Sequence, residues 1–386
     1  MNIHGNTATE IFECVRSLIQ SRQLVPGDSL PPVRELAVAL GVNRNTVASA
    51  YRRLVTSGIA VTQGRLGTLV RDPHRASEQE GATAGTTLFD LGDGNPDPAW
   101  LPDLGAALRT RAYRPRLYGD ATVNPTLEAH VRNWFGNDCP ARFEVDLAHG
   151  AVDAIERLLA LDLLAGDPVA VESPCFLSSI NLLRSSRLRA IGVPVDGEGM
   201  DPQALAAALE AGAQAVILTP RAHNPTGCSL SRKRARALSQ VLARHPNVLL
   251  VVDDHFSLLS THDYHSVIPR NARRWALIRS FSKFLGPDIR VAAVASDPQT
   301  AGQLRQRLAA GTGWVSHLLQ DIVEAAVTSP DNAALMAGAR ADYQRRRLAL
   351  EAALRRRGMP CADGGDGLNV WVPLAAGDRE LALALA

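Results

Sequence analysis

A lysine flanked by hydroxyl groups is the most reactive arrangement in the sequence. The segment Ser280-Phe-Ser-Lys-Phe-Leu-Gly-Pro-Asp-Ile-Arg290 places Lys283 directly after an apolar run, with Arg290 seven residues later. Lys283 has apolar surroundings, and a desolvated ammonium group has a lowered pKa and can form an imine with an aldehyde. Ser280, Ser282 and Arg290 would then bind a phosphate dianion, the arginine through its planar fork of donors. Taken alone, the motif fits an ordinary surface lysine equally well.

Two more segments add polar groups that suit a pyridine ring. Asp253 ends the apolar run 248–253, and a carboxylate there can keep a pyridinium nitrogen protonated, so that the ring accepts electrons. His255 would contact a ring hydroxyl, and Asn224, in the segment 223–227, would donate to the phenolate oxygen. Each has a simpler alternative, because Asp253 can be a helix cap and an Asn-Pro segment an ordinary turn.

A glycine and an aromatic residue complete the set. Gly150, Ala151 and Val152 open a helix after a short strand, so their backbone N–H groups and the helix dipole favour a phosphate. Phe176 would stack on the pyridine ring, although a core aromatic residue explains it equally well. Together the segments suit an aldehyde-bearing pyridine phosphate such as pyridoxal 5′-phosphate (PLP), and none of them is a metal site.

The elements that position these residues are short apolar runs separated by helical stretches. Runs without polar alternation predict strands covered on both faces, hence an α/β fold with a largely parallel sheet. The polar segments follow the ends of these strands, where ligands of open sheets bind. After about residue 331 we expect a long arginine-rich helix and then a smaller α+β C-terminal lobe. The expected strands are 168–172, 214–219, 248–253, 275–280 and 290–296, with helices at 152–164 and 230–243.

The first 71 residues have the order of elements of a winged helix. Periodicity predicts three helices, a glycine turn between the second and third, and two strands around a glycine-rich tip. Residues 1–75 hold nine arginines and five acidic residues, although the net charge of the chain is only +2. Such a basic end is typical of a module that binds a polyanion. The expected helices are 11–19, 29–40 and 44–57, and the strands 59–63 and 68–71.

The start of the third helix is expected to enter the major groove of duplex DNA. Arg44 and Asn45 would meet base edges there, while polar residues of the second and third helices and the wing bind phosphates. The alternative is a helical pair of the same shape used for protein contact. The expected DNA-binding residues are Arg34, Arg44, Asn45, Thr46, Ser49, Arg52, Arg65, Gly67 and Thr68.

Several blocks resemble known families. Leu30-Pro-Pro-Val-Arg-Glu-Leu-Ala and Val42-Asn-Arg-Asn-Thr-Val-Ala resemble the GntR winged-helix signature. Over residues 88–386, the order of glycine cup, aromatic residue, Asn-Pro-x-Gly, strand-end Asp and Ser-x-Ser-Lys resembles fold-type-I aminotransferases. The whole chain therefore resembles the MocR subfamily of GntR-type regulators. Segments such as Asn95-Pro-Asp-Pro and Leu117-Tyr-Gly-Asp resemble a member linked to vitamin B6 salvage.

The resemblance implies roles for particular residues. It implies an internal aldimine between PLP and Lys283, with Asp253 on the ring nitrogen. It also implies that Tyr118 reaches the phosphate of a partner subunit, so that the chain forms a homodimer. Most relatives have Tyr where His255 stands and His where Asn369 stands, so the groups around the ring differ here.

The same resemblance divides the chain. A winged-helix domain would span residues 1–71, a linker 72–87 and a PLP-binding body 88–386. Transaminases of this type bind the substrate carboxylate with an arginine near their C-terminus, and this sequence stops in the apolar run 381–386 before any match. We therefore expect a truncated C-terminus and little or no turnover.

The combined expectation is a regulator that binds a double-stranded DNA operator and senses PLP to control vitamin B6 metabolism. The alternative is an active PLP-dependent aminotransferase fused to a DNA-binding domain, while a structural chromatin protein would leave the cofactor residues unused. The residues are compatible with activation and with repression. Five scattered cysteines, no signal peptide and no long apolar run predict a cytoplasmic protein without membrane contact.

Overall fold

The computed structural model describes residues 3–62, 67–71, 92, 94–109, 114–362 and 364–373. The chain divides into two units, and each is described by itself. The tip of the expected wing at 63–66, which includes Arg65, the expected linker 72–87 and the end of the chain at 374–386 lie outside the described residues.

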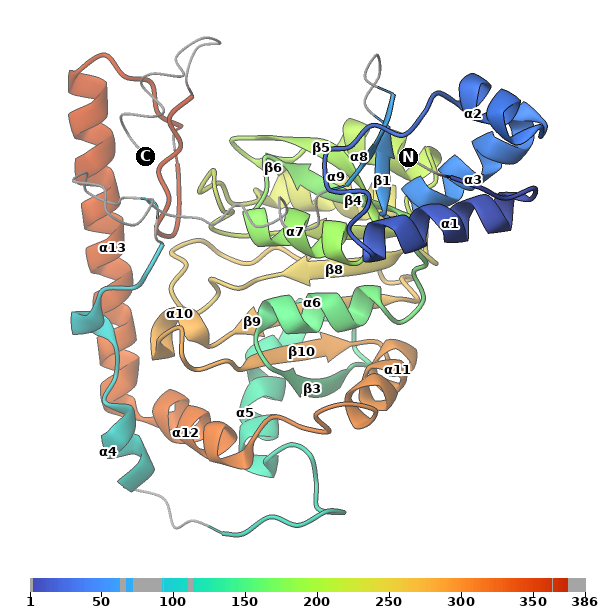
Figure 1. The fold of residues 1–386 in the computed structure, drawn as a ribbon. Helices are drawn as coiled ribbons and strands as arrows, with labels where there is room; N and C mark the ends of the chain where they lie inside the picture. The colour runs from blue at the N-terminus through green and yellow to red at the C-terminus, as the bar shows by residue number, and fades with distance from the viewer. Residues whose placement is uncertain are drawn as a thin grey trace. The chain divides into compact units, whose positions relative to one another are not determined.

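The N-terminal unit contains the three helices and the hairpin that the sequence predicts. Thr7 caps the first helix, and Asn43 caps the third by accepting a hydrogen bond from the N–H of Asn45. Gly41 ends the second helix at a φ of 65°, which glycine adopts without strain. Figure 1 labels the three helices and the first strand. The elements are α1 (Ala8–Gln20), α2 (Val33–Leu40), α3 (Arg44–Thr56), β1 (Ala60–Thr62) and β2 (Thr68–Val70).

The apolar faces of these helices meet in a small core. Val47, Ala50 and Leu54 of α3 are fully buried, while Ile11 and Val15 of α1 pack in the same cluster. The expected second helix begins late, at Val33, because the two prolines before it cannot donate the hydrogen bonds of a helix interior.

The body is built on an eight-stranded sheet in the order β3-β10-β9-β8-β7-β4-β5-β6. Strands β4, β7, β8 and β9 pair in parallel, which confirms the expected fold class. The expected strand at 290–296 forms as β10, but it is antiparallel to both β3 and β9. The strands are β3 (Glu144–Ala148), β4 (Pro168–Ser173), β5 (Arg189–Asp196), β6 (Gly199–Met200), β7 (Ala215–Leu218), β8 (Leu249–Asp253), β9 (Trp275–Ser280) and β10 (Ala292–Ser296).

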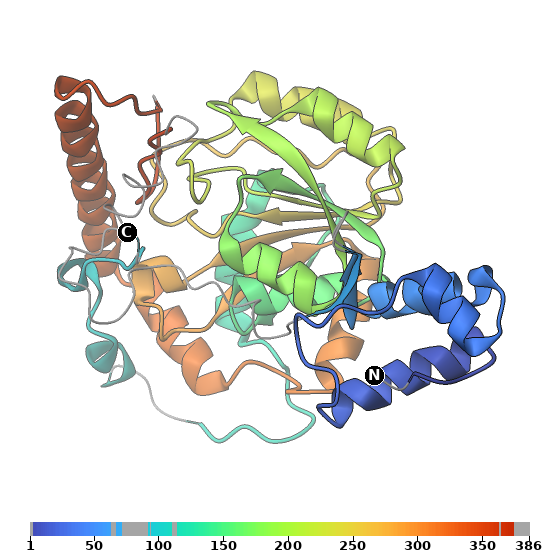
Figure 2. The ribbon, with the colours of Figure 1, turned by 45° about the horizontal axis from the view of Figure 1, so that its top comes forward.

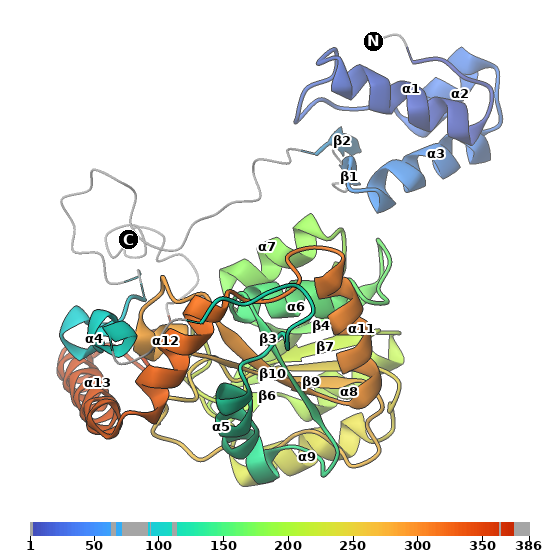
Figure 3. The same ribbon diagram turned by 90° about the horizontal axis from the view of Figure 1, so that it is seen from below.

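Helices cover both faces of this sheet. Figure 3 shows α6 and α11 on one face and α5 and α9 on the other, and Figure 2 shows α8 beside α9. Both faces are therefore apolar, and β7, β9 and β10 are buried along their whole length. The helices are α4 (Leu104–Arg109), α5 (Pro125–Phe135), α6 (Ala151–Leu159), α7 (Leu177–Ser185), α8 (Pro202–Glu210), α9 (Arg232–Leu242), α10 (Ser282–Leu285), α11 (Pro298–Ala309), α12 (His317–Thr328) and α13 (Pro330–Arg356), with 3-10 turns at Pro98–Trp100 and Gly136–Asp138.

The long arginine-rich helix expected after residue 331 is α13, which stands along one side of the body in Figure 1. It is tied to the segment before α4, because Trp100 Nε1 donates to Asp342 at 2.9 Å and Tyr343 Oη accepts from the N–H of Asp97 at 2.9 Å. Within the described part of the C-terminal region, residues 364–373 form no helix or strand. No helix in the described residues is long and apolar enough to cross a membrane.

Candidate functional site

The register of three strands brings the expected site residues to one edge of the sheet. Ala292, the first residue of β10, pairs with Ala148 at the end of β3 and with Ser280 at the end of β9. The turn after β3, the lysine after β9 and the arginine before β10 therefore all adjoin the same end of these three neighbouring strands. Figure 1 shows α10, which contains Lys283, beside these strand ends.

Gly150 and Arg290 form a contact that only glycine permits. A Cβ atom at Gly150 would lie 2.7 Å from Arg290 Nη2, and the φ of Gly150 is +95°. The helix α6 begins at the next residue, so its first N–H groups open beside the guanidinium group. Arg290 is exposed and makes no ion pair with any described residue. A helix start with a neighbouring unpaired guanidinium is the chemistry that binds a phosphate.

The two serines before the lysine are bonded within their own loop. Ser280 Oγ accepts from the N–H of Ser282 at 3.2 Å, and Ser282 Oγ donates to the carbonyl of Ile289 at 2.6 Å. The second bond joins the start of the Lys283 to Arg290 segment to its end. Lys283 itself is half-buried between buried neighbours, and its Nζ donates to the carbonyl of Gly94 at 3.3 Å.

Asp253 has one oxygen engaged and one available. His255 Nδ1 lies 3.3 Å from Asp253 Oδ2, so the histidine contacts the carboxylate directly. Asp253 Oδ1 is buried and has no hydrogen-bond partner among the described residues. A buried carboxylate oxygen without a donor is costly, and a protonated ring nitrogen would satisfy it. This unpartnered oxygen, together with the phosphate-binding groups at Gly150, Arg290 and the start of α6, shows that the residues present fit a pyridine phosphate.

The remaining expected residues divide into two groups. Asn224 Oδ1 accepts from Asn369 Nδ2 at 3.3 Å, which leaves the amide N–H groups of Asn224 to donate. Phe176 is half-buried directly before α7. Tyr118, by contrast, is 94% exposed and stacks edge-to-face on Trp314 at 5.6 Å, so it does not join the other residues within one chain.

A buried ion pair behind Asn224 was not predicted from the sequence. His223 Nε2 lies 3.3 Å from Glu172 Oε2, and the two side chains are 1% and 3% exposed. Burial opposes the charged form of His223, but the Glu172 carboxylate, with Cys228, outweighs it and raises the pKa of His223 to about 10. The signal in the sequence was a charged residue in the apolar run 168–173 together with a histidine shortly after the run 214–219.

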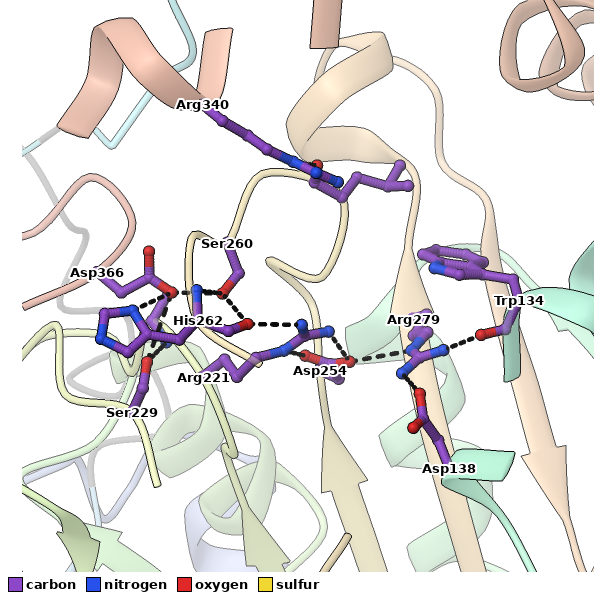
Figure 4. Close-up of polar contacts among 12 residues, drawn as sticks. Trp134, Asp138, Arg221, Ser229, Asp254, Ser260, His262, Arg279, Arg340 and Asp366 are labelled. Atoms are coloured by element: carbon purple, nitrogen blue, oxygen red, sulfur yellow. Dashed lines mark hydrogen bonds and ion pairs between the residues drawn. The ribbon is translucent and has the colours of Figure 1, made fainter. Parts of the chain in front are cut away.

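A second unpredicted network surrounds Asp254. This carboxylate is fully buried and accepts from Arg221 Nε and Nη2, at 3.0 and 2.6 Å, and from Arg279 Nε at 2.9 Å. Arg279 also donates to Asp138 at 2.6 Å. Figure 4 shows this row of alternating charges, which runs through Arg221, Asp254 and Arg279 to Asp138.

The expected DNA-binding residues lie on the outside of the N-terminal unit. They are exposed or half-buried, and those of α3 lie opposite its buried face. Gly67 takes a φ of +79° directly before β2. The placed residues of this set are Arg34 on α2, Arg44, Asn45, Thr46, Ser49 and Arg52 on α3, and Gly67 and Thr68 in the hairpin.

Two family models match the chain. The model for bacterial regulatory proteins of the gntR family matches residues 7–70, and the model for aminotransferase class I and II matches residues 86–386. These matches confirm both resemblances drawn from the sequence. Proteins with the aminotransferase class I fold typically bind PLP.

Named relatives extend over most of the chain. The vitamin B6 salvage pathway transcriptional repressor PtsJ of Salmonella typhimurium is 51% identical over 384 residues, covering 100% of this chain and 89% of PtsJ. The pyridoxine biosynthesis transcriptional regulator PdxR of Corynebacterium glutamicum is 29% identical over 307 residues, or 75% of this chain and 64% of PdxR. The multiple substrate aminotransferase of Thermococcus profundus, 23% identical over 76% of this chain and 79% of that chain, has the same fold with a TM-score of 0.67.

The buried pair gives a pH-dependent prediction. The folded pKa of His223, about 10, lies above its ordinary 6.5, so the pair stabilises fully below pH 6.5 and its contribution is lost as the pH rises through 10. Glu172→Gln should lower the free energy of unfolding of the body by about 3 to 5 kcal/mol at pH 6.5 and by much less at pH 10.

Thermal and denaturant unfolding of the full chain at both pH values measures this difference. Glu156→Gln is the control, because Glu156 is an exposed carboxylate of α6 and its loss should change stability by less than about 0.5 kcal/mol. A loss in Glu172→Gln that is equal at both pH values would show that His223 is uncharged.

Proposed function

The chain belongs to the MocR group of GntR-type regulators, in which a winged-helix head is joined to an aminotransferase-like body, and from this membership we propose that it is a PLP-responsive repressor of vitamin B6 salvage. PtsJ, the relative with 51% identity, is a repressor of that pathway by name. The head would bind an operator, and the body would bind PLP as the sensed ligand. In this proposal two chains act as a homodimer.

The unpartnered groups at the strand ends carry the cofactor part of the proposal. Asp253 Oδ1 and the guanidinium of Arg290 are polar groups without a described partner. They lie in segments that the sheet register brings to the same edge as Lys283. When bound, PLP supplies an aldehyde that an amine can capture reversibly.

Each residue of the proposed PLP site then has a defined role. Arg290, Gly150 and the first N–H groups of α6 would bind the phosphate, and Asp253 would hold the proton on the ring nitrogen. Asn224 would donate to the phenolate oxygen, and the amine of Lys283 would hold the aldehyde. His255 would orient Asp253 through its contact with Oδ2, which leaves Oδ1 for the ring nitrogen.

The DNA part follows from α3. Arg44 and Asn45 are exposed at the N-terminal end of this helix, the end that enters the major groove in helix-turn-helix proteins. The exposed Tyr118 supports the dimer, since a tyrosine that is 94% exposed in one chain can reach the phosphate of a partner subunit. Two linked heads would read two half-sites of one operator.

Reduction with borohydride tests cofactor binding. The sequence has two lysines, Lys233 and Lys283, which makes the assignment of a modified lysine simple. Full-length protein loaded with PLP should be yellow, and after reduction mass spectrometry should find the pyridoxyl group on the peptide of Lys283.

Lys283→Ala should lose the colour and the label, whereas Lys233→Ala should keep both, because Lys233 is exposed on α9. A colourless wild type, or a label on Lys233 alone, would contradict PLP binding at the strand ends. Rapid transamination when an amino acid and a keto acid are added would instead support the aminotransferase alternative.

Salt dependence tests DNA binding. Fluorescence anisotropy with a duplex enriched from a random pool should show binding that weakens steeply with salt, as expected when roughly 6 to 10 phosphates are contacted. Arg44→Ala should weaken binding of this duplex about ten-fold or more and reduce its preference over a random duplex.

Arg16→Ala is the control, because Arg16 lies on α1 and already pairs with Glu13. Repeating the titration with PLP measures the coupling between the body and the head. An affinity that PLP leaves unchanged would refute the sensing role, and an Arg44→Ala protein with wild-type preference would refute the assignment of α3 as the recognition helix.

A further inference from the structure

A second polar cavity opens on the body, away from the strand-end residues. Its volume is about 800 Å³, and its lining comes from the end of α5, the loop after β8, and α13. None of Gly150, Asn224, Asp253, Lys283 and Arg290 lines it. Arg221, Arg279 and Asp138 of the network described above line it, and Figure 4 shows Arg340 apart from this network.

The lining carries an excess of positive charge. Four arginines line the cavity, Arg221, Arg232, Arg279 and Arg340, against the two carboxylates of Asp138 and Asp263. Arg221 forms an ion pair with Asp254, and Arg279 forms ion pairs with Asp254 and Asp138, so the charges of these two arginines are neutralised. The surplus therefore comes from the side of the cavity formed by α9 and α13.

Arg340 is a half-buried arginine of the lining for which the described residues provide no ion pair. Its Nε donates to the carbonyl of Leu258 at 2.6 Å. Burial lowers the pKa of Arg340, and the nearby Arg221 guanidinium lowers it further. Arg221 and Arg340 line the same cavity and disfavour each other's charge, while the Asp366 carboxylate favours the charged form of Arg340; an anion placed between the two guanidinium groups would reduce their repulsion.

A buried hydroxyl group adds a third donor. Ser257 lines the same cavity, is 5% exposed, and its Oγ has no hydrogen-bond partner among the residues that the structure describes. An unsatisfied buried hydroxyl destabilises the protein unless a ligand or water bonds to it. The neighbouring hydroxyl groups of Ser260 and Thr261 are already committed to Asp366, so Ser257 is distinct from them.

We propose that this cavity is a second ligand site that binds a small phosphate monoester between Arg340 and Arg221, with Ser257 Oγ as the third donor. A phosphate monoester presents three terminal oxygens to these three donors, whereas a carboxylate presents two. The volume is that of a pocket for a whole small molecule, so the organic part of the ester fits beside the half-buried Trp134. The proposal does not depend on PLP binding at the strand ends.

Calorimetric titration with phenyl phosphate tests the site. The protein is first loaded with PLP and reduced with borohydride, so that the proposed phosphate site at Gly150 and Arg290 is filled. One further phenyl phosphate should bind per chain. Arg340→Gln should weaken this binding at least ten-fold, as expected for a charge-assisted hydrogen bond, and Ser257→Ala about five-fold.

Matched variants separate binding from folding. Arg345→Gln, in the same helix, should bind normally, because Arg345 is exposed and pairs with Asp342. Ser257→Ala should unfold at or above the wild-type temperature, since it removes an unsatisfied group. If the protein takes up no PLP, the titration is carried out on Arg290→Gln, which lacks the arginine of the proposed strand-end phosphate site. Failure of the cofactor proposal therefore leaves this test valid.

Two further probes identify the chemistry. Benzoate should bind more weakly than phenyl phosphate, and inorganic phosphate more weakly still if the organic part contributes. Inorganic phosphate that binds as tightly as the ester would assign the site to free phosphate. Wild-type protein that binds neither phosphate compound, or Arg340→Gln with unchanged affinity, would overturn the proposal.

Discussion

The carboxylate of Asp254 is the interaction on which the geometry of the body depends. It is fully buried and binds Arg221 from the loop after β7 and Arg279 from β9, while its own residue directly follows β8. These three segments are the ones that carry Asn224, Lys283 and Asp253. One buried oxygen pair therefore fixes the relative positions of three strand ends, and a small shift at any of them would separate groups that must act on one ligand.

Burying such a network has a large desolvation free energy, and the alternation of its charges reduces that penalty. Two arginines share Asp254, and Asp138 takes the outer side of Arg279, so the charges alternate and sum to zero. Aromatic rings complete the surroundings, because the guanidinium of Arg279 lies 5.2 Å from the Trp134 ring and 5.3 Å from the Tyr264 ring. Because buried ion pairs contribute little net stability, the advantage of this one is a defined position for the strand ends.

The sequence predicts what depends on local pattern and misses what depends on which strands become neighbours. Apolar runs located the strands of the body, and helical spacing located α1, α3 and α13, because burial on a face leaves a periodic trace. The direction of β10 leaves no such trace, since a buried antiparallel strand has the same composition as a parallel one. The expected site residues followed from position after a strand. Asp254 and His223 did not, because their partners are distant in the sequence.

The two candidate ligand sites of the body meet at one strand end. Successive residues of an extended strand point to opposite sides, and Asp253 and Asp254 accordingly engage different partners, His255 in one case and two arginines in the other. An anion bound between Arg221 and Arg340 would alter the ion pair between Arg221 and Asp254, and Asp254 directly follows Asp253, the residue proposed to bind the ring nitrogen. If that change alters the affinity for PLP, PLP must change the affinity for the anion by the same factor, because coupling between two ligands is reciprocal. The adjacent carboxylates of Asp253 and Asp254 would then connect the two proposed ligand sites.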